Sequence, residues 1–190
     1  PEYYSVNIGR EHWVFPDNIK YKNSAGSSLA VGAAGKLDYD GGLTDTHMKW
    51  LTKDLSLVAS DMNVIICSHT TIISDNSKGY TGDKVQVDSL ISMLGRFNST
   101  MLYNGHMHTM VFFDSKLYEG FKGMKVPATS GDMWESAPNH LLGLYGEDAG
   151  VYVVNFRGDE RTDRYVTHQY GDKWMQSICL WLRQSLRLLR

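Results

Sequence analysis

Two histidines one residue apart, His106 and His108, follow Gly105 at the end of a short apolar run. A third histidine, His69, stands in a similar place, because it follows the apolar run 64–67 and one serine. Imidazole is a ligand for zinc, iron and related transition metals, whereas magnesium and calcium prefer oxygen. The spacing therefore predicts a transition-metal site built from His69, His106 and His108.

The predicted ligands are imidazoles, with no carboxylate among them. The presence or absence of carboxylates separates a two-metal centre from a single-zinc site. Histidines alone would suit one zinc ion, whereas a two-metal hydrolase also needs carboxylates. In a tight turn after a strand, histidines at i and i+2 can diverge and serve two ions about 3.5–4 Å apart. Gly105 has no Cβ, so we expect the backbone to approach an ion or a phosphate there.

The other histidines are predicted to be structural. His12 is expected to be an ordinary strand residue and His47 to lie on the surface of a helix. His140 and His168 have no partner at metal-ligand spacing.

Short apolar runs predict the strands that would position the three histidines. Tyr4, Val6 and Ile8 alternate with polar residues, a period of two that predicts a half-buried strand. Residues 12–15 are expected to pair with it as a hairpin, and the continuous run 64–67 is typical of a strand buried on both faces. Further strands are expected at 101–104, 111–113, 124–128, 151–156 and 164–168.

Two segments have helical spacing. Thr44 or Asp45 can cap the first helix. Its apolar face is made by Met48, Leu51, Leu55 and Val58, and its exposed face includes Lys49, Lys53 and Asp54. Asp83 can cap another helix, whose apolar residues are Val87, Leu90, Ile91 and Leu94. Residues 23–42, rich in glycine and serine, are expected to form a loop or insertion. The order strand, helix, strand, helix, strand predicts an α/β fold with a mixed sheet.

Composition excludes several classes of protein. A formal charge of −2 gives no whole-chain attraction to nucleic acid or to anionic lipid. No apolar run approaches the roughly 18–20 residues that a transmembrane helix needs. Cys67 and Cys179 stand far apart, which argues against a disulfide framework. Residues 174–190 are apolar and basic. This composition allows three interpretations: a membrane-surface or partner-binding helix, a helix packed on the domain, or an altered tail.

The chain resembles the C-terminal half of a calcineurin-like metallophosphoesterase. Residues 3–6 and 12–18 resemble the hairpin after the family's Gly-Asn-His motif, and residues 46–55 resemble its Q-x-x-W-L-x-x-D-L helix. Residues 64–69 match the strand that ends in a metal-binding histidine, and residues 103–108 match the closing G-H-x-H motif. The match covers about residues 1–113 in the family's order, and residues 127–131 further resemble a bacterial subgroup with a C-terminal β extension.

The resemblance implies a fold and an activity. It implies part of a metallophosphoesterase-type β-sandwich of mixed sheets flanked by helices, with the N-terminal portion missing. Residues 1–130 would be the C-terminal half of the catalytic domain, and residues 131–190 a β-rich extension ending in a basic amphipathic segment. The parent protein would hydrolyse phosphomonoesters or phosphodiesters with two divalent transition metals (Mn, Fe or Zn). Its compartment, cytoplasmic or periplasmic, is left open by the sequence.

The resemblance also assigns metal ligands. His69 and His106 would bind the second metal and His108 the first. The remaining ligands and the proton-donating histidine belong to D-x-H, G-D-x-x-D and G-N-H-D/E motifs upstream, so no catalytic residue is expected in this chain and the chain alone is expected to be inactive. Thr71 stands where the family usually has a proline, which changes the stiffness of the loop after His69.

Two alternatives belong to other functional classes. A non-catalytic domain could hold a single structural zinc on His69, His106 and His108, with Asp17 or Cys67 as the fourth ligand. A membrane- or partner-associating module could instead depend on residues 174–190.

Overall fold

The computed structural model describes residues 3–22, 38–73, 79–107, 110–126, 150–157 and 160–167, and the chain divides into two compact units. The first unit contains residues 1–107 and 111–126, and the second contains residues 108–110 and 127–190. Within the first unit, six strands form one sheet in the order β1-β2-β5-β6-β8-β7. These strands are β1 (Tyr4–Ile8), β2 (Glu11–Phe15), β5 (Asn63–Ser68), β6 (Ser99–Asn104), β7 (Val111–Asp114) and β8 (Lys122–Lys125).

The sheet is mixed, as the sequence predicts for an α/β fold. β2, β5, β6 and β8 run parallel, whereas β1 is antiparallel to β2 and β7 is antiparallel to β8. The predicted loop at 23–42 is wrong at its end, because β4 (Asp38–Gly41) pairs there with β3 (Ile19–Lys22). The rest of that predicted loop, residues 23–37, lies outside the described residues.

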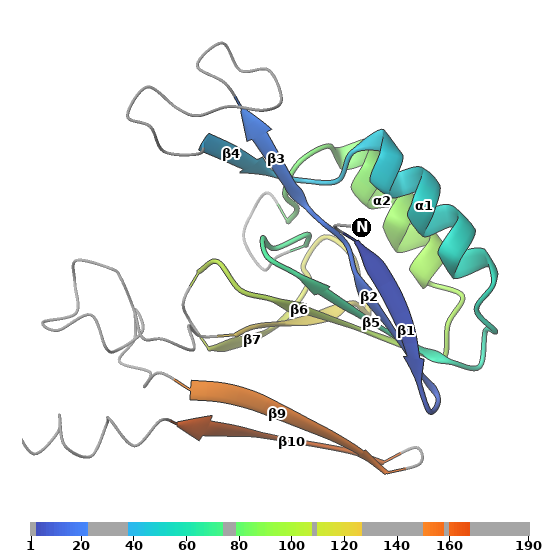
Figure 1. Ribbon diagram of the computed structural model, residues 1–190, viewed down its shortest axis with the longest axis vertical. Helices are drawn as coiled ribbons and strands as arrows, with labels where there is room; N and C mark the ends of the chain where they lie inside the picture. Colours follow the sequence, from blue (N-terminus) through green and yellow to red (C-terminus); the bar gives the residue numbers. More distant parts are fainter. Residues whose placement is uncertain are drawn as a thin grey trace, which may run out of the picture. The chain divides into compact units, whose positions relative to one another are not determined.

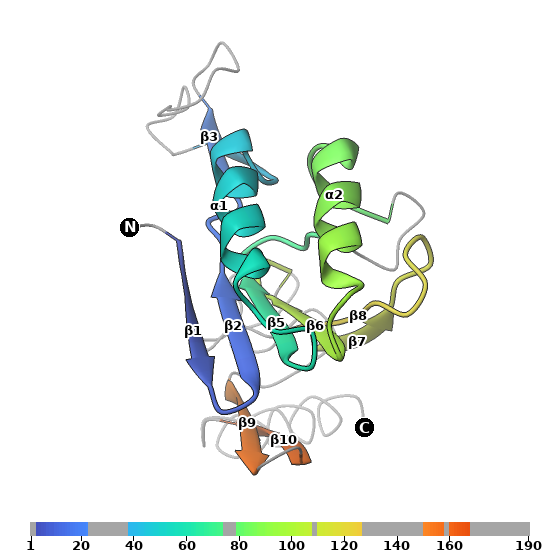
Figure 2. The same ribbon diagram turned by 90° about the vertical axis from the view of Figure 1, so that its right-hand side faces the viewer.

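Both predicted helices form, and both cover the same face of the six-stranded sheet (Figures 1 and 2). α1 (Asp45–Ser56) begins after the N-cap Thr44, and α2 (Lys84–Leu94) begins after the N-cap Asp83. Their apolar faces pack on the sheet in one core, whose fully buried members include Val14, Leu51, Ile66, Leu90 and Leu94. Among the described residues, no helix has the length and apolar character needed to cross a membrane.

His47 is buried, so its predicted surface position is wrong. It is the third residue of α1, where its backbone N–H donates to Thr44 Oγ1 at 3.2 Å and its Nδ1 accepts from the Thr44 backbone N–H at 3.3 Å. This reciprocal pair is a capping box in which histidine stands in the place of the usual Glu or Gln. The ring also contacts Tyr3 edge to face, with the centroids 5.2 Å apart.

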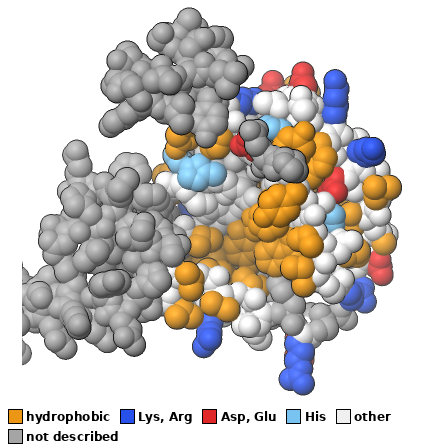
Figure 3. Space-filling view, in the orientation of Figure 1, with side chains coloured by type: hydrophobic (Ala, Val, Ile, Leu, Met, Phe, Trp, Pro, Cys, Tyr) orange, Lys and Arg blue, Asp and Glu red, His pale blue; other side chains and the backbone are white. Residues whose placement is uncertain are grey.

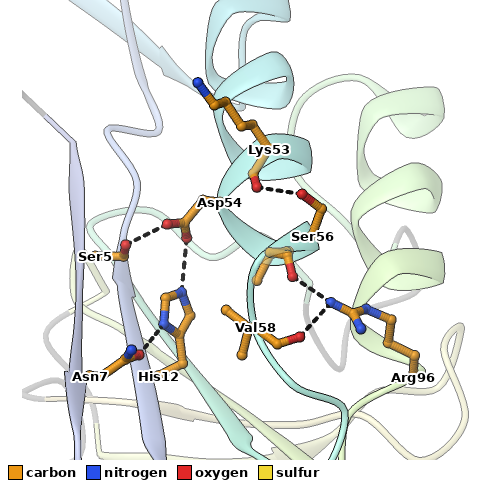
Figure 4. Close-up of polar contacts among 9 residues, drawn as sticks. Ser5, Asn7, His12, Lys53, Asp54, Ser56, Val58 and Arg96 are labelled. Atoms are coloured by element: carbon orange, nitrogen blue, oxygen red, sulfur yellow. Dashed lines mark hydrogen bonds and ion pairs between the residues drawn. The ribbon is translucent and has the colours of Figure 1, made fainter.

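Asp54, which the helical pattern places on the exposed face, is half-buried and joins α1 to the β1–β2 hairpin (Figure 4). Its Oδ2 lies 2.9 Å from His12 Nε2, and its Oδ1 accepts a hydrogen bond from Ser5 Oγ at 2.6 Å. His12 Nδ1 lies 2.6 Å from Asn7 Oδ1, so both ring nitrogens of this buried histidine have partners. His12, predicted to be an ordinary strand residue, therefore belongs to a polar network that the sequence pattern does not reveal.

The strand β1 is present as predicted, but its polar side chains are the ones that face the helices. Ser5 lies opposite Val14 of the core, so Tyr4, Val6 and Ile8 lie on the other face and are 52%, 42% and 54% exposed. Tyr4 stacks there on Phe15 with the ring centroids 4.7 Å apart. Figure 3 shows hydrophobic side chains gathered on one face of the molecule, among them residues of this strand.

The described part of the second unit is a β-hairpin. β9 (Gly150–Arg157) pairs antiparallel with β10 (Glu160–Thr167), near the strands predicted at 151–156 and 164–168. β10 begins at Glu160 instead of Arg164. Residues 174–190, for which a helix is one prediction, lie outside the described residues, and the predicted division at residue 130 stays a prediction.

Candidate metal and substrate site

The candidate site lies where the parallel strands end. Because β2, β5, β6 and β8 run in the same direction, their carboxyl ends meet at one edge of the sheet, the usual position of ligands in open α/β sheets. His69 directly follows β5, Gly105 alone separates His106 from β6, and Lys125 is the last residue of β8. The predicted strand ends are therefore brought to one place by the topology.

Two buried side-chain amides fix the turn that carries His69. Asn18, which follows β2, donates from Nδ2 to the carbonyl oxygen of Thr70 at 2.7 Å and accepts from the Thr70 N–H at 3.2 Å. Asn104, the last residue of β6, donates to Thr71 Oγ1 at 2.8 Å. Both asparagines are only 1–2% exposed, so these bonds form away from competing water and hold the turn tightly.

His69 and His106 lie side by side. Their ring centroids are 5.1 Å apart and their planes are inclined by 70°. An ion about 2.0–2.1 Å from one nitrogen of each ring lies roughly 3 Å from each centroid, and a near-tetrahedral angle then separates the centroids by about 5 Å. The observed spacing therefore suits two ligands of one transition-metal ion.

The backbone at His106 is in the left-handed region, with φ of 65°. A side chain other than glycine in this conformation costs roughly 1–2 kcal/mol, and such residues are concentrated at functional sites. By contrast, a Cβ built on Gly105 would lie 3.9 Å from the His69 carbonyl oxygen, an ordinary contact. The unusual conformation that turns the chain here therefore belongs to His106, and the approach of the Gly105 backbone to an ion or a phosphate stays a prediction.

Tyr39 is the residue of the site that sequence patterns miss. It lies in β4, and its Oη is 3.2 Å from His106 Nδ1. If Nδ1 carries the proton and donates to the tyrosine oxygen, Nε2 is the nitrogen of His106 that would bind a metal. The signal that could reveal Tyr39 is the alternation of polar and aromatic residues in 38–41, which pairs in register with 19–22.

Replacing Tyr39 by phenylalanine is expected to weaken zinc binding by about 10-fold, because partners of a ligating histidine fix its tautomer and orientation. The measurement is calorimetric titration of the chain with Zn²⁺. Tyr4→Phe removes a hydroxyl from an exposed tyrosine and serves as the matched control. Equal affinities for both variants and the parent sequence would show that Tyr39 does not position His106.

Within its described residues, the structure brings no other predicted ligand to the histidine pair. His108 lies outside the described residues. Among residues that are described, no three of His, Cys, Asp and Glu are grouped closely enough to hold a metal ion. Asp17 instead accepts a hydrogen bond from the Ile19 N–H at 3.1 Å, and burial raises the pKa of the Cys67 thiol to about 12, which keeps it protonated at neutral pH.

A cavity of about 410 Å³ adjoins the histidine pair, with His106 in its wall. It is bounded by β4, by the turns after β5 and β6, by the turn before α2 and by the end of β8. Its described lining is about equally polar and apolar, and it includes Asp40 and Lys125. The candidate metal position at the histidine pair therefore lies beside a small pocket.

Comparison with known proteins identifies no family for this chain. No family model and no curated protein matches the chain. One solved structure, GAP50, described as the anchor in the inner membrane complex of Plasmodium, aligns with a TM-score of 0.49 and 14% identity. The alignment covers 89% of this chain and 50% of that chain, so this chain spans about half of its length. A likeness at this level assigns neither a family nor a function.

Proposed function

We propose that this chain is the C-terminal half of a calcineurin-like metallophosphoesterase and contributes metal ligands to a two-metal phosphoesterase centre. The observation that supports the proposal best is the pair formed by His69 and His106, whose rings lie 5.1 Å apart although 37 positions separate them in the chain (106 − 69 = 37). The resemblance predicts that these two histidines share one metal.

In this proposal each residue of the site has a limited role. His69 and His106 hold one metal, the hydroxyl of Tyr39 orients His106, and His108 contributes to the other metal. When bound, the metals supply positive charge to the phosphoryl oxygens and a water whose pKa is near neutrality. The bridging carboxylate and the proton donor would come from the upstream half, so the isolated chain is expected to bind metal weakly and to hydrolyse no phosphate ester.

The first test is metal binding by the chain itself. Replacing His69 or His106 by alanine is expected to weaken Zn²⁺ binding by about 100-fold, because each change removes one of the few ligands. His47→Gln is the matched control, since it removes a buried imidazole while glutamine preserves the capping box with Thr44. Unchanged affinity in both alanine variants would overturn the assignment of the pair.

The second test is the coding sequence directly upstream of Pro1. The proposal requires D-x-H, G-D-x-x-D and G-N-H-D/E motifs there, in frame and in that order. The protein expressed from that longer frame should hydrolyse p-nitrophenyl phosphate or bis-p-nitrophenyl phosphate in a metal-dependent manner. A frame that starts at Pro1 would contradict the proposal, because the centre would then lack most of its ligands.

A further inference from the structure

Asn104 is the last residue of β6 and lies where the regular sheet ends. Its Cα partner on β5 is Ser68, the last residue of that strand, and its partner on β8 is Lys125. His69 and His106 therefore both come after the last paired position of β5 and β6. Because the described pairing of these strands stops short of both histidines, other contacts must set the distance between the two rings.

The side-chain amide of Asn104 joins the two loops that carry these histidines. Its Nδ2 donates to Thr71 Oγ1 at 2.8 Å, and both residues are buried, with 2% and 9% of their surface exposed. Thr71 lies two residues after His69, and Asn104 lies two residues before His106. The bond therefore links the loops close to both rings, and the surrounding protein shields it from competing water.

Two further contacts attach the turn after β5 to other parts of the sheet. The Thr70 carbonyl oxygen accepts hydrogen bonds from Asn18 Nδ2 at 2.7 Å and from Ser68 Oγ at 2.9 Å. These bonds fix the turn to the end of β2 and to the end of β5. The backbone of Asn104, by contrast, leads within two residues to His106. The Asn104 amide therefore couples the turn after β5 to the loop that carries His106.

The left-handed backbone at His106 needs such a restraint. A φ of 65° is unfavourable for a residue with a Cβ, and it persists only where the surrounding contacts impose it. With the loop anchored at Asn104, the ring of His106 stays 5.1 Å from the ring of His69, the spacing that suits one transition-metal ion. Two ligands held at this spacing bind a metal more tightly than two mobile ligands, because folding has already ordered them.

We propose that Asn104 and Thr71 are positioning residues, which hold the imidazoles of His69 and His106 at metal-binding distance before a metal arrives. Neither residue binds the metal, and both act through the two histidines. The inference rests on the proposed function for the presence of a metal, whereas the arrangement of the rings can be measured in the metal-free chain.

The first measurement is the nuclear Overhauser effect between the ring protons of His69 and His106 in the metal-free chain. This ring-to-ring signal falls steeply with distance, so it reports the spacing of the imidazoles directly. Thr71→Val removes the acceptor of the Asn104 amide with little change in side-chain size, and it is expected to abolish the signal. Thr71→Ser retains the hydroxyl and is expected to retain the signal.

Calorimetric titration with Zn²⁺ then measures the consequence for binding. Asn104→Ala and Thr71→Val are each expected to weaken zinc binding about 10-fold, as for other partners that orient metal ligands. The double variant should bind no more weakly than either single variant, because both changes remove the same bond. If Asn104→Ala does not fold, Thr71→Val replaces it in this comparison.

Asn63→Ala is the matched control. It removes a hydrogen bond from Asn63 Nδ2 to Glu11 Oε1 at the opposite end of β5, 2.7 Å long. This change is expected to lower the free energy of unfolding while leaving the ring-to-ring signal and the zinc affinity unchanged.

The outcomes separate this inference from the proposed function. A ring-to-ring signal that Thr71→Val leaves intact, or a zinc affinity that Asn104→Ala lowers no more than Asn63→Ala does, overturns the positioning role even if zinc binds at the histidine pair. If the unaltered chain binds no zinc, the proposed metal site fails. A signal that depends on the Thr71 hydroxyl then still supports the positioning of the two rings, and a signal that does not depend on it overturns this positioning as well.

Discussion

Asp54→Ala is expected to lower the free energy of unfolding by about 2–4 kcal/mol, because a buried polar network loses the acceptor that its members share. Asp54 accepts from Ser5 and faces the ring of His12, whose side chain is only 5% exposed. Removing the carboxylate leaves a buried imidazole nitrogen and a serine hydroxyl without their partner (Figure 4). Leaving one member of a buried pair unpartnered is far more destabilising than losing an exposed contact.

Urea unfolding followed by tryptophan fluorescence measures this difference. Asp61→Ala is the matched control, because Asp61 is an exposed aspartate whose oxygen lies 3.6 Å from Arg10. A change within about 0.5 kcal/mol is expected for this control, as for other surface ion pairs. If Asp54→Ala destabilises no more than Asp61→Ala, the network does not contribute to attaching β1 and β2 to α1.

Gly82→Ala is expected to destabilise the first unit by about 3 kcal/mol. Gly82 has φ of 87°, where a Cβ costs roughly 1–2 kcal/mol. A Cβ there would also lie 2.8 Å from Gly42 Cα and 3.2 Å from the Gly41 carbonyl oxygen. Because both neighbours are backbone atoms, the contact cannot be relieved by rotating a side chain, and overpacking of this kind adds about 1–3 kcal/mol.

Gly95→Ala is the control, for which a gain in stability is expected instead of a loss. Gly95 ends α2 with a helical φ of −62°, and a Cβ there would meet no atom closer than 3.7 Å. Alanine at such a position is expected to stabilise the protein by about 0.4–1 kcal/mol, because it restricts the unfolded chain. Equal unfolding free energies for the two alanine variants would show that the close approach of the turns at Gly42 and Gly82 is not required.

The strands that carry the histidines could be predicted because their residues are apolar and lie between clear breaks. The run 64–67 lies within β5, and 101–104 forms the end of β6. Tertiary contacts decide which polar side chains are buried, and the hydrophobic pattern does not show this. Asp54 looks exposed on a helical wheel, yet the partner that buries it lies in a hairpin about 40 residues earlier.

The polar residues that shape the site are harder to predict. Asn18 and Asn104 look like ordinary turn residues in the sequence, and only the parallel pairing of β2, β5 and β6 brings their amides to the turn at Thr70 and Thr71. Tyr39 is hidden at the end of a segment rich in glycine and serine. Such residues are identified by a neighbour distant in sequence, which a local pattern does not contain.

The parallel pairing of β2 with β5 has a consequence for synthesis of the protein. Asn63 donates a hydrogen bond to Glu11 across 52 residues of chain, and β6 comes later still. The β1–β2 hairpin therefore leaves the ribosome long before the strand that completes its pairing, and sheets built from such distant segments form slowly. During that interval Val14, which is buried in the folded core, is exposed on the nascent chain beside Tyr4, Val6 and Ile8, so this hairpin is a segment that needs protection by a chaperone.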